Sequence, residues 1–151
     1  MSSTVELATP PARDLEVVDP QERLRGYHAH IYFGPETRGA VEALLRALRA
    51  SPAMVAVRTI GRLHDRPVGP HPRPSVQLEV PLAGAGLVLS WLALNRGDLT
   101  VFVHAITDDE VWDHVHNAMW MGEMLPLVNL ECLDNPNGRS LDAFRGRGSA
   151  P

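Results

Sequence analysis

The sequence predicts an α+β protein of the ferredoxin-like class, in which a βαββαβ antiparallel sheet carries an additional C-terminal helix. A chain of 151 residues with 44% hydrophobic residues fits one globular domain. Along it, the hydrophobic period switches between two, typical of strands, and about 3.6, typical of helices. We expect strands over residues 27–33, 54–64, 75–80 and 99–104, and helices over residues 35–50, 83–95 and 107–121. This order is the split βαβ pattern followed by one more helix.

The first strand and the first helix follow from two clear patterns. Residues 27–33 alternate, so that one face carries Ala29, Ile31 and Phe33 and the other carries His28, His30 and Tyr32. The strand ends at Gly34, and Pro35 suits the first turn of a helix. Residues 35–50 then repeat apolar side chains at helical spacing, at Val41, Leu44, Leu45 and Leu48.

The middle of the chain predicts two strands, a loop and a second helix. We expect a strand over residues 54–64. Residues 65–74 hold four prolines and form a loop, because proline cannot donate to a strand ladder. Residues 75–80 alternate, with Gln77 and Glu79 on the outward face. Residues 83–95 are apolar and helical, and the helix ends before Gly97.

The last two predicted elements are a strand and a helix. In residues 99–104, Val101 and Val103 share one face, and His104 lies on the other. We expect Thr107 to cap a helix over residues 107–121 that has acidic residues in its first turn. Its apolar stripe, which favours a core or dimer contact, consists of Trp112, Val115, Met119 and Trp120. For His114 and His116, on the same helix, we expect a solvated or capping role.

The predicted topology brings several histidines together. Right-handed crossovers give the strand order fourth, first, third, second, with both main helices on one face and the other face open. We expect the first strand to run parallel to the third and antiparallel to the fourth. The start of the first strand then lies beside the end of the fourth and the loop that enters the third. His28, His30, His71 and His104 therefore converge at one corner, and the three on strands point away from the helices.

Such a corner is suited to a metal ion. Histidines two apart on a strand hold their Cβ atoms roughly 7 Å apart, close enough to share one ion through bonds of ~2.1 Å. A third histidine from the neighbouring strand completes a site with open positions, which suits a catalytic Fe, Zn, Cu or Ni ion. A single strand histidine is more often a hydrogen-bonded surface residue, but the convergence of three segments favours chemistry. Glu79 could add a carboxylate ligand, although an exposed strand glutamate is the commoner alternative.

Composition excludes several classes of function. The 14 Lys and Arg against 18 Asp and Glu give a net charge of −4, which argues against nucleic-acid binding through bulk charge. The sequence has no apolar run long enough for a membrane span and no secretory signal pattern. Cys132, the one cysteine, favours a reducing, cytoplasmic location. We expect residues 1–21 to form a mobile arm, residues 22–133 a single catalytic domain, and residues 134–151 a flexible tail.

Four motifs resemble one known family. YHAHIYF, RLHDRPVGPHP, LALNRGDLTVFVHA and DHVHNAMWMGE followed by LPL are similar, in this order, to the DOPA 4,5-dioxygenase family of ring-opening enzymes. The resemblance implies a ferredoxin-like fold, non-haem Fe(II) as cofactor, O₂ as co-substrate and extradiol cleavage of a small catechol such as L-DOPA. The family pattern matches His30, His71 and His104, which it implies as the metal ligands, and it also matches His64.

The resemblance also implies roles for residues beside the metal. His28 or His64, whichever is not a ligand, would act as general base and later as acid. Tyr32 would hydrogen-bond or stack on the ring, Arg62 or Arg66 would hold an amino-acid carboxylate, and Gln77 would flank the substrate. An exposed sheet face commonly needs a cover, so we expect a homodimer or the tail segments to close the pocket.

Two alternatives to a catechol dioxygenase remain open from the sequence. The first is a dimeric ferredoxin-like module that binds a metal or an aromatic ligand without turnover. It is motivated by residues that depart from the family's usual ones at Gln77, Ala105 and Ile106. The second is a zinc-dependent hydrolase that uses the same histidines. Oxygen consumption, ligand binding alone, or ester turnover with zinc would distinguish the three.

Overall fold

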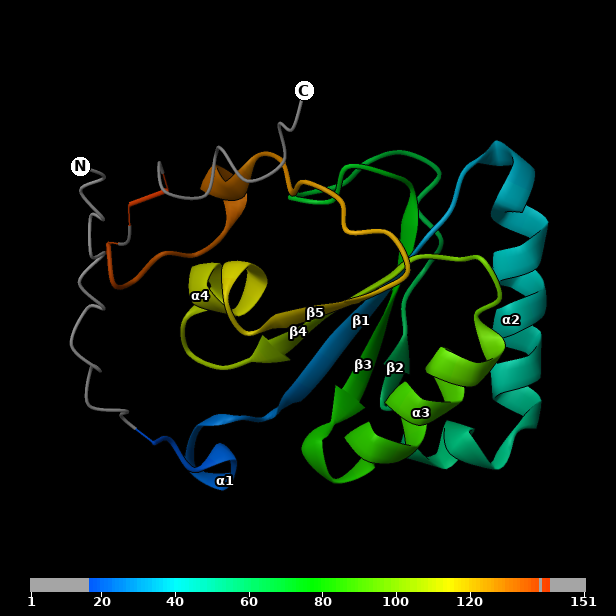
Figure 1. Cartoon of the computed structure of the whole chain (residues 1–151), viewed down its shortest axis with the longest axis horizontal. Coiled ribbons are helices and arrows are strands. Elements are labelled where there is room, and N and C mark those ends of the chain that lie inside the picture. The colour runs from blue at the N-terminus through cyan, green and yellow to red at the C-terminus, as the bar shows by residue number, and fades with distance from the viewer. Residues whose placement is uncertain (1–16, 139, 142–151) are drawn as a thin grey trace, which may run out of the picture.

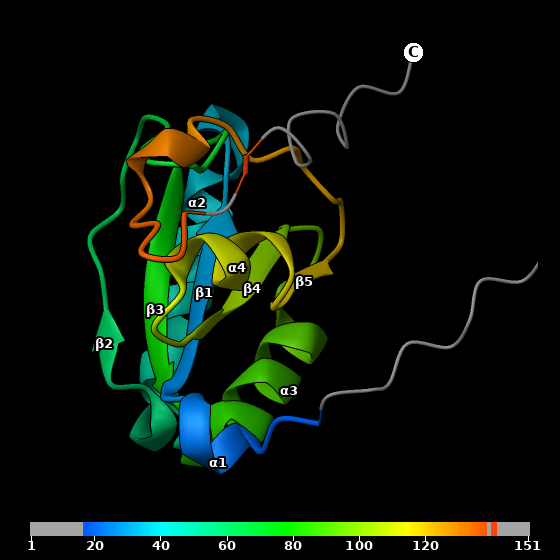
Figure 2. The same ribbon diagram turned by 90° about the vertical axis from the view of Figure 1, so that its left-hand side faces the viewer.

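The computed structural model describes residues 17–138, 140 and 141 of the chain. In this part, a five-stranded sheet is flanked by helices on both faces (Figures 1 and 2). The helices are α1 (Pro20–Arg23), α2 (Arg38–Ala50), α3 (Ala85–Asn95) and α4 (Glu110–Val115). The strands are β1 (Gly26–Tyr32), β2 (Thr59–Ile60), β3 (Ser75–Pro81), β4 (Val101–Ile106) and β5 (Ala118–Met121). None of the helices in the described residues has the length and apolar character needed to cross a membrane.

The strand order confirms the predicted ferredoxin-like arrangement and extends it. The sheet runs β2-β3-β1-β4-β5, which is the expected order with β5 added at one edge. One expectation about direction is wrong, because β1 pairs with β3 antiparallel rather than parallel. In this sheet β3 lies between β1 and β2, which a crossover connects, and β3 runs antiparallel to both of them. The loop that enters β3 therefore lies beside the end of β1, at Tyr32, and not beside its start.

The main core lies between the sheet and the helices α2 and α3. The predicted inward residues of β1 are fully buried there, as Ala29 and Ile31 show. The predicted apolar face of α2 packs against them, at Val41, Leu44, Leu45 and Leu48. From α3, Val88 and Leu92 complete the layer. This core fixes which side chains of β1 and β4 point to the opposite face.

The second predicted strand is much shorter than expected. In place of a strand over residues 54–64, the chain forms a 3₁₀ turn at Pro52–Ala56 and pairs regularly with β3 only at Thr59–Ile60. Pro52 favours the first turn of a helical segment, and Val55 is 89% exposed, so no alternating inward face exists there. Further on, His64 forms an isolated bridge with Ser75.

The helix predicted over residues 107–121 is also wrong in its extent. The helix begins after Asp109, whose side chain accepts the Trp112 amide, so Asp109 rather than Thr107 is the N-cap. It ends at Val115, and the chain turns so that the Asn117 carbonyl accepts the Ala105 amide. The apolar residues read as a helical stripe belong partly to β5, which pairs with β4.

The sheet face opposite α2 and α3 is covered by the chain itself. Figure 2 shows α4 lying across this face, with the segment that follows β5 beside it. Two small apolar clusters hold this cover, one around Phe102 and Leu125 and one around Val111 and Leu130. The expectation that this face would be open is therefore corrected. The homodimer expected to close it stays a prediction.

The two ends of the chain were expected to be mobile, and residues 1–16, 139 and 142–151 lie outside the described part. Inside the predicted arm, the short helix α1 is capped by the Asp19 side chain, which accepts the Gln21 amide. Inside the predicted tail, the Asp134 amide donates to Glu110 and the Asn137 side chain donates to Asp109. These contacts tie the described tail residues to the first turn of α4.

The buried carboxylate of Asp113 supplies a test of how α4 is held. It is 2% exposed and accepts from the Thr107 amide and hydroxyl, at 2.7 and 2.8 Å, and from Asn117 at 3.3 Å. Asp113→Ala leaves these donors without their partner, so we expect the free energy of unfolding to fall by about 1–3 kcal/mol. Urea denaturation measures the loss. Asp108→Ala, which removes an exposed ion pair with Arg23, is the control and should change stability by less than ~0.5 kcal/mol.

Candidate metal centre

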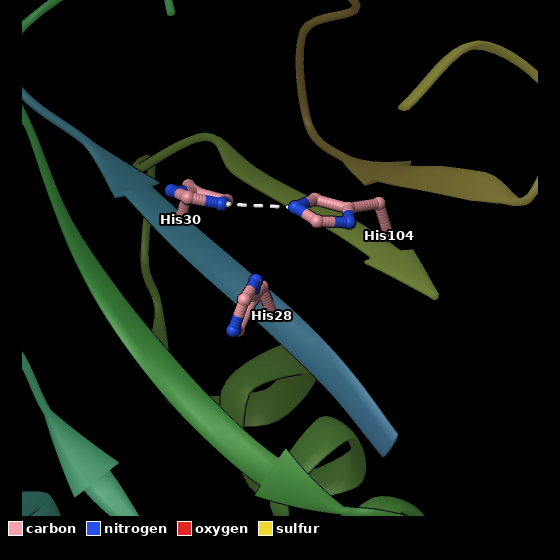
Figure 3. A group of neighbouring side chains, drawn as sticks. All are labelled: His28, His30 and His104. Atoms are coloured by element: carbon pink, nitrogen blue, oxygen red, sulfur yellow. Dashed lines mark hydrogen bonds between the residues drawn. The ribbon is translucent and has the colours of Figure 1, made fainter. Parts of the chain in front are cut away.

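Three histidines from β1 and β4 lie together on the sheet face opposite α2 and α3. His28 and His30 alternate with the buried Ala29, and the antiparallel register places His104 directly across from His28. Figure 3 shows the three imidazoles gathered over the two strands. One ligand nitrogen from each lies within 4.8 Å of the others. The expected convergence of these three side chains is therefore present.

The closest pair of nitrogens has the spacing of two ligands on one ion. The Nε2 atoms of His30 and His104 are 3.2 Å apart. Two nitrogens bonded to one metal at ~2.1 Å are separated by roughly 3.0 Å in an octahedral site and 3.4 Å in a tetrahedral one. The Nδ1 of His104 lies 2.8 Å from the Ala105 carbonyl, which can only accept, so this nitrogen carries the proton. The Nε2 lone pair of His104 therefore points into the site, as a metal ligand requires.

His71 lies beside this group but faces it differently. Its ring centroid is 3.9 Å from that of His30, so the two rings are packed face to face at a tilt of 33°. Its Nδ1 shares a hydrogen bond of 2.7 Å with the hydroxyl of Tyr32, which burial keeps protonated by raising the phenol pKa. Among the described residues, the nitrogens that converge belong to His28, His30 and His104, not to His71.

His114 is a site residue for which the sequence predicted only a solvated or capping role. It is 6% exposed, and its ring centroid is 3.8 Å from that of His104 and 6.2 Å from that of His71. Its Nδ1 donates to the Glu110 carbonyl at 2.8 Å, which leaves Nε2 as the nitrogen with a lone pair. The sequence signal for its burial was its position three residues after Val111, because residues three apart lie on the same side of a helix.

The histidines border a cavity of about 230 Å³. It combines imidazoles with a small apolar wall and two polar side chains from β3. Its lining consists of His28, His30, His64, Val68, Gly69, Pro70, His71, Ser75, Gln77, His104, Glu110, His114 and Leu133. Such a mixture of apolar surface and a few convergent polar groups is typical of a small-molecule site.

The other predicted site residues divide between the cavity and its surroundings. His64 and Gln77 line the cavity, and Gln77 lies across from His30 on β3. Arg62 and Arg66 are exposed and do not line it. The expected contact of these arginines with a substrate carboxylate is therefore not supported by their placement.

Glu79, the open alternative as a carboxylate ligand, has a different partner. It lies across from His28 on β3, but its Oε1 accepts from the Arg58 side chain at 2.8 Å. Its oxygens are not among the ligand atoms that converge in the described residues. The group that could bind a metal is therefore made of imidazoles alone.

Burial keeps these imidazoles neutral. Desolvation lowers the pKa of His30 well below its ordinary value of 6.5, the pKa of His71 to about 4 and that of His104 to about 2. The pKa values of His28 and His114 are lowered for the same reason, against the raising effect of nearby carboxylates. At neutral pH each imidazole therefore has one nitrogen with a lone pair. A cation can bind without releasing a proton to solvent once the proton in the hydrogen bond between His30 and His104 moves to the Nδ1 of His30.

The lowered pKa values predict a loss of stability in acid for the metal-free protein. As pH falls through 6.5, unfolded imidazoles take up protons while the buried ones do not, so the unfolded state binds more protons and gains stability. Each such histidine lowers the free energy of unfolding by up to ~1.4 kcal/mol per pH unit, over a window that for His71 extends from 6.5 to about 4. Urea denaturation in EDTA at several pH values measures this slope. His104→Asn should reduce it by about one histidine's share, and equal slopes for the two proteins would contradict the explanation.

Comparison with known proteins identifies two curated relatives that match 83% and 45% of this chain. The chain is 38% identical over 132 residues to a protein of Amanita muscaria named DOPA 4,5-dioxygenase, covering 83% of this chain and 57% of that protein. It is 42% identical over 78 residues to an uncharacterized 21.2 kDa protein of Botryotinia fuckeliana, covering 42% of it. The chain thus spans only about half the length of these curated relatives.

A solved structure shares the fold over nearly its full length. This protein of Nostoc punctiforme, named a "putative dioxygenase", aligns with a TM-score of 0.70 at 35% identity, covering 77% of this chain and 96% of its own. The α+β fold is therefore shared with a structure determined by crystallography. Residues 27–131, which hold every histidine discussed above, match the model of one protein family. Together these findings show that the chain belongs to the Dopa 4,5-dioxygenase family.

Proposed function

We propose that the protein is a non-haem Fe(II) dioxygenase that uses O₂ to open the ring of a small catechol such as L-DOPA. The observation that carries this proposal is the group of neutral imidazoles that line a small cavity, with His30 and His104 buried and His28 half-buried. The name of the Amanita muscaria relative supports the substrate class. The chain covers 57% of the length of that relative, so the activity has to be measured on this protein itself.

The residues present fit an iron ion. Three imidazoles, two of them already 3.2 Å apart, leave further coordination positions open, as non-haem oxygenase chemistry requires. Bound Fe(II) would supply the redox chemistry that brings the catechol and O₂ to reaction. We assign His28, His30 and His104 as its ligands. The set that the family resemblance implies, with His71 in place of His28, is the alternative that experiment must separate.

The remaining cavity residues would bind the ring and handle its protons. Val68, Pro70 and Leu133 offer apolar surface to the faces of an aromatic ring. With His28 assigned to the metal, His64 is the cavity residue we propose as general base and later acid. It is half-buried, so it can pass a proton between the substrate and water.

Tyr32 and His71 form a second pair beside the site. Their 2.7 Å hydrogen bond fixes the His71 ring against His30 and so restricts how that ligand can rotate. Trp120 packs against Tyr32, with ring centroids 5.9 Å apart. We propose that this pair positions His30 rather than reacting itself.

Oxygen uptake tests the proposed reaction. The protein is loaded anaerobically with Fe(II), mixed with L-DOPA and exposed to air, while dissolved oxygen and visible absorbance are recorded together. We expect consumption of one O₂ per L-DOPA and a new yellow product, since a ring-opened catechol is a conjugated aldehyde acid. Protein loaded with Zn(II) is the control and should consume none. Catechol binding without oxygen consumption would instead favour a non-catalytic binding module.

The ligand assignment predicts different results for two histidine substitutions. His28→Asn should reduce bound iron to well below one ion per chain, because it removes one of the three converging nitrogens. His71→Asn should retain one ion per chain, because His71 lies outside the converging group. Metal analysis after gel filtration measures both, with circular dichroism as the check on folding. The reverse result would restore the ligand set of His30, His71 and His104.

A further inference from the structure

A second hollow adjoins the histidine cavity. It has a volume of about 280 Å³, and His28, His104 and Glu110 line both spaces. Its other walls come from Arg25, from Ala105 to Asp108, and from Asp113 and Asp134. It therefore lies toward the start of β1 and the end of β4, whereas the histidine cavity extends toward Ser75. We call it the head-group chamber.

Within the described part of the chain, Arg25 is the one cationic side chain that lines the head-group chamber. Its backbone amide donates to the Ile106 carbonyl at 3.0 Å, and its Nη2 donates to the Thr107 carbonyl. These two bonds hold the guanidinium over the end of β4. Among the described residues it has no carboxylate partner, so its remaining donors can serve a carboxylate in the bidentate geometry that arginine favours.

Four carboxylates of the described residues also line the chamber and give it a complementary charge. Two of the four are occupied, because Asp113 accepts from Thr107 and Asp108 pairs with Arg23. Glu110 uses only Oε2, which accepts the Asp134 amide, and the Asp134 side chain has no partner among the described residues. The lining of the chamber thus combines one guanidinium with two carboxylates that can accept further hydrogen bonds.

We propose that the head-group chamber binds the α-ammonium and α-carboxylate of an amino-acid substrate, with Arg25 holding the carboxylate and Glu110 and Asp134 the ammonium. The proposal rests on the proposed function, since the catechol ring would lie in the adjoining histidine cavity. Each space alone is smaller than the ~300–1,000 Å³ usual for ligand sites, and the two together fall within that range. Arg25 takes the role that the family resemblance implies for Arg62 or Arg66, neither of which lines either space.

Four catechols that differ only in the head group test this assignment. They are L-DOPA with both charges, dopamine with the ammonium, 3-(3,4-dihydroxyphenyl)propanoate with the carboxylate, and catechol with neither. Anaerobic titration calorimetry on the Fe(II)-loaded protein measures their binding, and oxygen uptake measures KM and kcat separately. The variants are Arg25→Gln, Asp134→Asn and the control Arg23→Gln, which changes an exposed arginine two residues away that does not line the chamber.

The assignment predicts a selective loss of affinity. Arg25→Gln should weaken L-DOPA and the propanoate by about 10-fold or more, the value of a charged hydrogen bond, and leave dopamine and catechol unchanged. Asp134→Asn should weaken L-DOPA and dopamine only. Arg23→Gln should leave all four compounds unchanged. The effect should fall on KM rather than kcat, because the head group lies away from the reacting ring.

The outcomes separate this inference from the proposed function. Equal affinity for all four catechols, or equal losses in Arg25→Gln and Arg23→Gln, would overturn the head-group chamber, even if O₂ is consumed. The protein could instead prefer L-DOPA in binding, lose that preference in Arg25→Gln, and consume no oxygen with any catechol. That result would support the head-group chamber and overturn the proposed dioxygenase activity. If Arg25→Gln lowers the melting temperature, Arg25→Lys replaces it and should keep only part of the preference, because lysine keeps the charge but not the bidentate geometry.

Discussion

The register of β1 against its two neighbours is the constraint on which the site depends. Side chains alternate along a strand, so a slip of one residue would send His28 and His30 into the core and Ala29 to the cavity. That slip is prevented from the other face, where Ala29 and Ile31 are fully buried under α2 and α3. The hydrophobic core thus fixes the positions of the imidazoles, although it does not touch them.

The cavity is built from imidazoles that stabilise each other by packing rather than by charge. The rings of His30, His71, His104 and His114 lie at contact distances, and burial lowers the pKa of each one. Charging a buried ring carries a desolvation penalty, and a second charged ring would add repulsion, so protonation of the group destabilises the fold. The same neutrality makes it a ready cation site. The acid sensitivity of the metal-free fold and the capacity to bind a metal therefore have one physical origin.

The sequence predicted the parts of the structure that a local period specifies. Alternation in β1 and β4 placed His28, His30 and His104 on one face, and the crossover rule placed β1 between β3 and β4. The prediction from the sequence failed where contacts between residues distant in the chain determine the secondary structure. The apolar residues after His116 fit a helix as well as a strand, and only pairing with β4 makes them β5. His114 was missed because it is buried only where α4 lies over the sheet, and that placement depends on the turn between α4 and β5.

Local patterns described the segment from Ala105 to Asp113 poorly, and this segment supplies most of the lining of the head-group chamber. It turns the chain back over the sheet, supplies Glu110 to both hollows and holds the Thr107 carbonyl that accepts from Arg25. The metal-binding face depends instead on β1 and the core beneath it. Two largely separate sets of residues therefore control two positions, that of a bound ion and that of the polar end of a substrate. Substitutions in this segment can change which small molecule fits while the imidazoles stay in register.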